Sequence, residues 1–331
     1  MNARKNLFLY IAIAAAVLAF GVVMLGAYVR LSQAGLGCPD WPGCYGHVAV
    51  PSSSEVNSTL LAARPLEPAR AWKEMIHRYF VGALSALIFA LGVLAFWRRK
   101  QAEQPKLLPS LLVVLLVLQA LLGMWTVTLL LFPPVVTAHL LGGLATFSLL
   151  VLLVLQSGAY LELGAAATDG MRRLAALSLV VLICQIALGG WVSSNYAAIA
   201  CPDFPTCQGS FWPPMDFASG FSWHGLGKDY QGGILANPAR MAIHMTHRLG
   251  ALITFLIVGF TSFDIALRTR NWLLRLVAGM VGALLLTQIA LGISLVELGW
   301  PLAIADLHNG VAALLLGSVV TLNWAVNVGK R

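Results

Sequence analysis

The amino-acid sequence predicts an all-α integral membrane protein with eight transmembrane helices, arranged as two tandem four-helix bundles related by duplication. Of the 331 residues, 59% are hydrophobic and only 10% are charged, whereas about a quarter of the residues in a soluble domain are charged. Eight apolar runs are long enough to span the ~30 Å hydrocarbon core of a bilayer. Several sequence phrases also occur once in each half of the chain.

Each apolar run is expected to form one helix. The first follows Arg4 and Lys5, as the apolar run of a signal peptide would. It is longer than the ~7–15 residues of such a run and no good cleavage site follows it, so we expect it to be retained. The runs lie near residues 7–28, 75–97, 107–131, 135–156, 174–195, 242–265, 273–296 and 302–326.

The positions of the basic residues predict the orientation in the membrane. More than half of the 21 Lys and Arg residues lie in the short connections or near the ends of the chain, at Arg4, Lys5, 98–106, Arg172, Arg173, Arg268, Arg270, Arg275, Lys330 and Arg331. Such residues favour the cytoplasmic side. We therefore expect cytoplasmic termini, periplasmic long loops (29–73 and 196–241) and a place in the bacterial inner membrane. The net charge of +8 then reflects orientation and does not indicate a nucleic-acid partner.

Repeated phrases indicate that a four-helix unit has been duplicated. "GLGCPDWPGC" (35–44) recurs as "AIACPDFPTC" (198–207), and "HRYFVGAL" (77–84) recurs as "HRLGALI" (247–253). "QALLGMWTV" (119–127) recurs as "QIALGISLV" (288–296), with a third copy, "QIALGGWV", at 185–192. Because each unit has an even number of helices, both units should have the same orientation. The predicted halves are residues 1–160 and 161–331.

Four histidines are predicted to lie at similar depth, each within about the first two turns of an even-numbered helix. They are His77, His139, His247 and His308. Paired imidazoles inside an apolar bundle are typical of six-coordinate heme iron. A hydrogen bond to a neighbouring helix would explain any one of them alone, but four at matched depth favour heme. Zinc is less favoured, because each half offers few further ligands, and no Cys-x-x-Cys-His motif for covalent heme occurs.

Three charged residues accompany the histidines. Arg78 and Arg248 directly follow His77 and His247; they either reach toward lipid headgroups or contact heme propionates, and their matching positions favour the propionates. Glu74 lies one turn before His77 on the same helix face, where it either stabilises the helix N-terminus or acts as a base at the reacting carbon. The second half has His244 at that place, so one pocket is predicted to be reactive and the other structural or electron-transferring.

Two Cys-x5-Cys pairs lie in the predicted periplasmic loops. Cys38 and Cys44 form the first pair, and Cys201 and Cys207 the second. An oxidising compartment favours a disulfide in each loop. A metal site is a weak alternative, and a redox-active role for the first pair remains open. Cys184 is expected to be a small buried core residue.

Taken together, these motifs resemble the heme A synthase family over essentially the whole chain. The resemblance rests on eight helices in two halves, "EMIHR" at 74–78, histidines in helices 4, 6 and 8, and the "CPDWPGC" and "CPDFPTC" loops. It implies oxidation of the C8 methyl of heme O to a formyl group by two successive hydroxylations, which yields heme A for terminal cytochrome oxidases. Neither this substrate nor this product is derived from the residues themselves.

The resemblance also implies a role for each site residue. His77 and His139 would hold heme O in the N-terminal half, and His247 and His308 a heme b cofactor in the C-terminal half. Glu74 matches the acid of the family and would either stabilise a cationic intermediate or take a proton from water.

The main alternative is a membrane diheme b-type cytochrome that transfers electrons between quinone and periplasmic partners. It explains the four histidines equally well, but it gives no reason for an acid in one half only. A prenyltransferase is not favoured, because no paired Asp motif for magnesium is present, and a heme or copper transporter would need ligands across both leaflets. Expected partners are heme O and heme A, lipid, and by extension heme O synthase and oxidase assembly factors. The sequence leaves open the electron acceptor, the role of loop 208–240, and a homo-oligomeric state.

Overall fold

Eight long helices make up most of the chain in the computed structural model, which describes residues 3–57, 61, 64–97, 105–158 and 167–328. Each helix is long and apolar enough to cross a membrane, so the predicted eight-helix membrane protein is confirmed. The described residues form no β-strand, only two isolated bridges in the loops. The helices are α1 (Ala3–Leu31), α3 (Pro68–Trp97), α4 (Leu107–Thr128), α5 (Pro133–Ser157), α6 (Asp169–Ser194), α8 (Asn237–Arg268), α9 (Trp272–Glu297) and α10 (Leu302–Val328).

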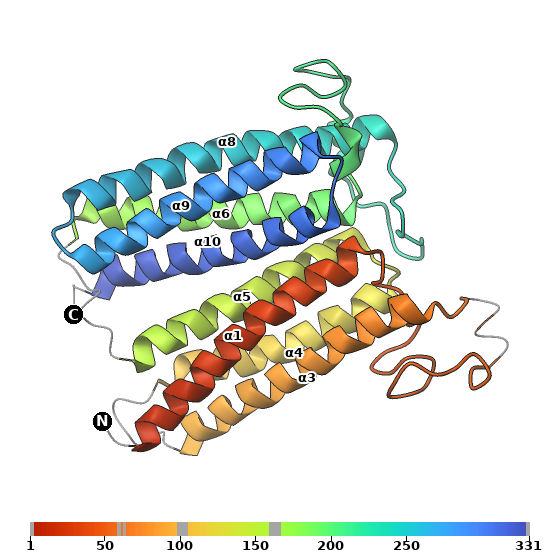
Figure 1. Cartoon of the computed structure of the whole chain (residues 1–331), viewed down its shortest axis with the longest axis horizontal. Helices are drawn as coiled ribbons and strands as arrows, with labels where there is room; N and C mark the ends of the chain where they lie inside the picture. Colours follow the sequence, from red (N-terminus) through yellow and green to blue (C-terminus); the bar gives the residue numbers. More distant parts are fainter. Residues whose placement is uncertain (1–2, 58–60, 62–63, 98–104, 159–166, 329–331) are drawn as a thin grey trace.

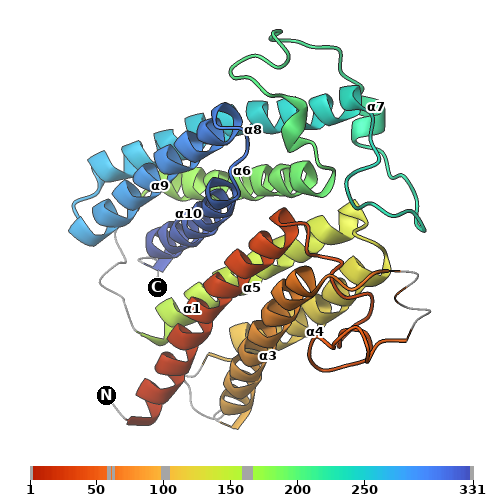
Figure 2. The ribbon, with the colours of Figure 1, turned by 45° about the vertical axis from the view of Figure 1, so that its right-hand side comes forward.

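The helices are arranged as two bundles of four that lie side by side (Figures 1 and 2). In the first, α1 packs on α3 and α5, and α4 packs on both of these, so α3 and α5 stand on one diagonal. In the second, α6 and α9 likewise separate α8 from α10. The predicted boundary at 160/161 lies outside the described residues, and so do the basic residues 98–100, 330 and 331.

One apolar core runs through both bundles. Helices α1 and α5 contact α10, and α5 also contacts α6. The most apolar stretch of α10 has 56% of its residues buried, against 17–33% in the other helices. The reason is that α10 packs on helices of its own bundle and also on α1 and α5 of the first. Polar contacts join the bundles at the end that carries the long loops: Arg30 donates to the Ser193 carbonyl (2.7 Å) and to the Tyr196 hydroxyl (2.9 Å).

Two sequence predictions are corrected. Helices α3 and α8 begin at Pro68 and Asn237, earlier than expected, since proline near a helix start costs no hydrogen bond. His77 and His247 therefore lie in the third helical turn instead of the first two. Cys184 is exposed on α6 and not buried, because a small apolar side chain is equally suited to the outer face of a membrane helix.

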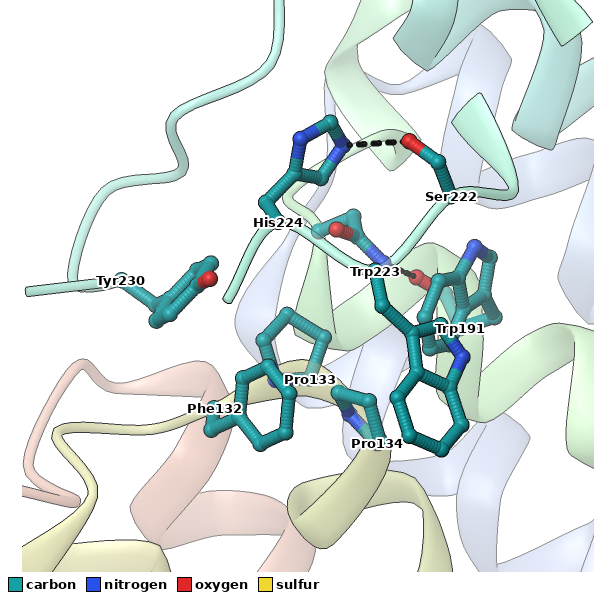
Figure 3. A pocket seen from close by; sticks show the side chains of 9 residues that line it. Phe132, Pro133, Pro134, Trp191, Ser222, Trp223, His224 and Tyr230 are labelled. Atoms are coloured by element: carbon teal, nitrogen blue, oxygen red, sulfur yellow. Dashed lines mark hydrogen bonds between the residues drawn. The ribbon is translucent and has the colours of Figure 1, made fainter. Parts of the chain in front are cut away.

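A segment of the second long loop crosses to the first bundle; we call residues 221–233 the strap. Its Tyr230 is only 2% exposed and packs with Phe132 and Leu131 of the first bundle. Figure 3 shows the Tyr230 and Phe132 rings side by side at a crevice of about 10 Å³, room for about one water molecule. His224 is bonded within its own loop, with Nε2 2.8 Å from the Ser219 carbonyl.

Candidate functional site

Each of the four predicted ligand histidines packs its ring against a glycine of the neighbouring helix. A Cβ atom added to that glycine would lie 3.1–3.3 Å from Cε1 of the imidazole. Because that is closer than most side-chain contacts, any larger residue would require the ring to shift by a few tenths of an ångström. The contacts are His77 to Gly26 of α1, His139 to Gly123 of α4, His247 to Gly189 of α6, and His308 to Gly292 of α9.

The histidines form one pair in each bundle. His77 and His139 are the N-terminal pair, on the diagonal helices α3 and α5, and their rings lie within electrostatic reach of each other. His247 and His308 are the C-terminal pair, related in the same way on α8 and α10. All four rings are partly buried. The structure therefore brings together the residues that the sequence analysis paired.

Unsatisfied polar atoms at both pairs fit a group that is bound through imidazole. Buried nitrogen and oxygen atoms in proteins are normally hydrogen-bonded. Among the described residues, several buried atoms at these sites have no such partner: Nδ1 of His77, His139 and His308, Nε2 of Gln119, and Oε1 of Gln185 and Gln288. Paired neutral imidazoles in an apolar bundle, each cradled by a glycine, are a donor set that suits heme iron.

Glu74 joins the N-terminal pair to the first disulfide loop. Its side chain is 5% exposed. One carboxylate oxygen accepts the backbone N–H of Cys38 (2.9 Å), and the other accepts a hydrogen bond from Arg78 (2.5 Å). The sequence analysis placed Glu74 one turn from His77 but did not anticipate its bond to the disulfide backbone, which no local pattern encodes.

The second half has a histidine in the corresponding contact. His244 is 4% exposed, its Nε2 accepts a hydrogen bond from Nε of Arg248 (3.3 Å), and its ring packs edge-on against Trp300. Arg248 therefore has a neutral partner where Arg78 has a carboxylate.

Both arginines bind the disulfide loop beside them. Each guanidinium donates to loop carbonyls at matching places, Asp40, Pro42 and Gly43 for Arg78, and Asp203, Pro205 and Thr206 for Arg248. Charge-assisted bonds of this kind are among the stronger ones in proteins. That the arginines also contact propionates stays a prediction, and such a contact would share the guanidinium with these carbonyls.

The two cysteine pairs form disulfides, Cys38–Cys44 and Cys201–Cys207, as the sequence analysis expected. An aspartate shapes each loop: Asp40 and Asp203 accept the backbone N–H groups of the residues five and six positions later. Hydrogen bonds from the Thr206 hydroxyl and the Gly209 N–H lower the pKa of Asp203 below its usual value. The sequence analysis missed the role of these aspartates, although the repeated Cys-Pro-Asp phrase could have revealed it.

A polar cavity of about 220 Å³ lies between the first long loop and the strap. Its lining includes Arg64, which forms an ion pair with Asp229 of the strap (3.2 Å). It also includes Gly37, which immediately precedes the disulfide cysteine that binds Glu74. Water in this cavity can therefore come close to the loop backbone that binds Glu74.

Comparison with known proteins places the chain among proteins of cytochrome oxidase assembly. The COX15-CtaA model, described as cytochrome oxidase assembly protein, matches residues 9–320. The chain belongs to this family. It is 44% identical over 308 residues to a protein of Shewanella oneidensis named heme A synthase, with 92% of each chain covered. Proteins with the same name from Caulobacter sp. and Halalkalibacterium halodurans are 28% and 26% identical, with 94% of this chain and 93% of each relative covered.

Family membership agrees with the resemblance inferred from the motifs. The eight apolar helices fit a multi-pass protein of the bacterial inner membrane. The relatives' name implies an enzyme of heme A biosynthesis, with heme A as product.

Proposed function

We propose that this protein is a heme A synthase that oxidises the C8 methyl group of heme O to a formyl group by successive hydroxylations. In this proposal the N-terminal half, residues 1–160, binds heme O between His77 and His139. The C-terminal half, residues 161–331, binds heme b between His247 and His308. A bound heme b supplies one-electron redox chemistry beside the substrate half.

The observation that carries the proposal is the difference between Glu74 and His244. Both residues lie three positions before a ligand histidine and four before an arginine that holds a disulfide loop. The carboxylate is therefore not required to bind the arginine, since a histidine does so in the second half. An acid in one pocket alone supports chemistry there and not in the other.

Glu74 is proposed as the catalytic acid–base residue. Its two oxygens are held by Arg78 and by the Cys38 N–H, so the carboxylate has a fixed direction relative to His77. Each carboxylate oxygen can accept more than one hydrogen bond, which leaves capacity to take a proton from water or to stabilise a positive charge at the reacting carbon.

Arg78 and Arg248 are proposed to contact the propionates of the two hemes. Their position supports this proposal, because each guanidinium lies between a ligand helix and the loop above it. We also propose that the loops face the periplasm and that both termini face the cytoplasm. The reason is that basic residues collect at the end of the helices opposite the long loops. Heme O synthase and oxidase assembly factors are proposed partners for supplying substrate and receiving product.

The test is to purify the chain from cells that make heme O, extract its hemes and identify them by chromatography and mass. Wild type is expected to yield heme A or its hydroxylated precursor. Glu74→Ala is expected to retain heme O, and His247→Ala to lose one equivalent of heme b. If every sample contains only heme B, with two equivalents in wild type, the chain is a diheme electron carrier and the proposal is wrong.

A further inference from the structure

A glutamine lies one turn before the glycine that contacts a ligand histidine in three of the four helices involved. The repeated phrase Gln-x3-Gly places Gln119 before Gly123, Gln185 before Gly189 and Gln288 before Gly292. Residues four apart lie on the same face of a helix. The phrase therefore places a side-chain amide and a glycine on the helix face that meets one histidine. The proposed function assigns the glutamine no role.

The amides reach the histidines in the second bundle. Nε2 of Gln185 lies 3.1 Å from Nδ1 of His247 and also donates to the His247 carbonyl (3.0 Å). Nε2 of Gln288 lies 3.0 Å from Nε2 of His308. In both glutamines Oε1 is buried and has no partner among the described residues. A half-turn of the Gln288 amide would bring this acceptor to the ring nitrogen, whereas the same turn of Gln185 would give up its hydrogen bond to the His247 carbonyl.

The first bundle carries the phrase beside one histidine only, and there Nε2 of Gln119 and Nδ1 of His139 both lack a hydrogen-bond partner among the described residues. Gln119 packs so closely on α5 that a Cβ atom added to Gly142 would lie 1.7 Å from its Nε2. On α1, however, the residue four before Gly26 is Val22, which packs into the apolar core. Nδ1 of His77, like that of His139, has no hydrogen-bond partner among the described residues, so what distinguishes His77 is the valine in place of a glutamine.

We propose that Gln185 and Gln288 are positioning residues that bind the imidazole nitrogen not used by iron and keep the cofactor heme in place. His77 has Val22 where the amide would be, and it is therefore the ligand that releases the substrate heme. This inference rests on the proposed heme sites. A histidine that binds a metal almost always donates its other N–H to an acceptor, which fixes the ring and raises its basicity. A permanent cofactor needs two ligands whose rings are held by such a hydrogen bond. A substrate that must leave needs a ligand whose ring is not held in this way.

The test uses the full-length chain, purified with heme b, and measures the midpoint potential and the rate of heme transfer to apomyoglobin. Gln185→Met and Gln288→Met keep the side-chain length but remove the amide. Each is expected to raise the midpoint potential and to weaken heme retention about tenfold. Gln185→Glu keeps an acceptor and is expected to lower the potential. A role in packing alone would not produce shifts of opposite sign.

Two further variants complete the experiment. Thr287→Val is the matched control: it neighbours Gln288, and its hydroxyl donates to the Ala283 carbonyl of its own helix. Val22→Gln should slow the release of heme from the N-terminal pair. If the potentials and release rates of the glutamine variants equal those of Thr287→Val, the role of the glutamines is overturned while the heme site stands. If His247→Ala leaves the heme content unchanged, the C-terminal heme site fails and this inference fails with it.

Discussion

The two disulfide loops are built alike, but the side chain that meets each of them from the histidine helix differs. In both loops an arginine binds several loop carbonyls, and an aspartate accepts two backbone N–H groups. Glu74 accepts a hydrogen bond from the Cys38 N–H of the first loop, whereas His244 packs against Trp300, which lies between α9 and α10 and outside the second disulfide loop. The comparison shows which parts serve the scaffold and which are specific to one half.

The most direct way to break this comparison is to remove the carboxylate. Glu74→Gln is expected to lower the rate of heme O oxidation by about 10²–10⁴-fold, the usual contribution of an acid–base residue. The heme content should stay normal, because the histidines are untouched. The ratio of heme A to heme O in extracts measures the effect. A normal ratio in Glu74→Gln would mean that the difference between the halves has no bearing on the chemistry.

The next largest effect is expected where the two halves meet. Tyr230→Ala removes the buried ring that attaches the strap to the first bundle and should cost roughly 3 kcal/mol of unfolding free energy. The midpoint of thermal unfolding and the rate of proteolysis within 221–233 both report this loss. Trp223→Ala is the control: its side chain is 78% exposed, so a change within about 0.5 kcal/mol is expected. Equal effects would show that the strap is not attached through Tyr230.

The disulfides sharpen the comparison, because the same change can be made in each loop. Replacing either cysteine pair by serine should destabilise its loop by about 2 kcal/mol, the entropy expected for so short a ring. Only Cys38→Ser with Cys44→Ser should also lower heme A formation, since the Cys38 N–H holds Glu74. Unfolding curves and heme extracts of the two double variants give both quantities. Equal losses of heme A would contradict a specific link between the first loop and the reaction.

The smallest expected effect concerns pH. The folded-state pKa of Asp203 is lowered, chiefly by the Thr206 hydroxyl. The stabilisation that this carboxylate gives the loop is therefore fully present above its unfolded-state pKa, near 3.9. This stabilisation is lost as the pH falls through the lower pKa of the folded state. Thr206→Val should shift this loss to higher pH, which hydrogen exchange of the Gln208 and Gly209 amides can measure. An unchanged acid profile would show that the hydroxyl does not stabilise the charge.

Much of the fold was predictable from local composition. A helix that crosses a bilayer must satisfy its own backbone hydrogen bonds over about 20 apolar residues, so the eight spans are visible in any window of that length. The histidine pairs were predictable for a related reason, since helix direction and distance from the helix start determine depth. The starts of α3 and α8 were placed wrongly, because the polar first turns of these helices extend beyond the apolar run.

The contacts of the polar side chains could not be predicted in the same way. Nothing near Glu74 in the chain indicates that its carboxylate binds the Cys38 N–H, 36 residues earlier. The position of the strap is equally non-local, since Tyr230 packs on residues about 100 positions away, in the other bundle. The matching positions of Arg78 and Arg248 suggested propionates, but in the structure both guanidinium groups reach loop carbonyls.

The sequence by itself therefore determined the class of protein, the number of helices, the pairing of the four histidines and the difference between Glu74 and His244. These depend on periodicity, length and repetition, which are properties of short segments. The tertiary structure alone decided which glycine cradles each histidine and that amides reach His247 and His308, whereas Val22 stands in the corresponding place near His77. Such contacts depend on how one helix packs on another, and helix packing is settled only when the whole core forms.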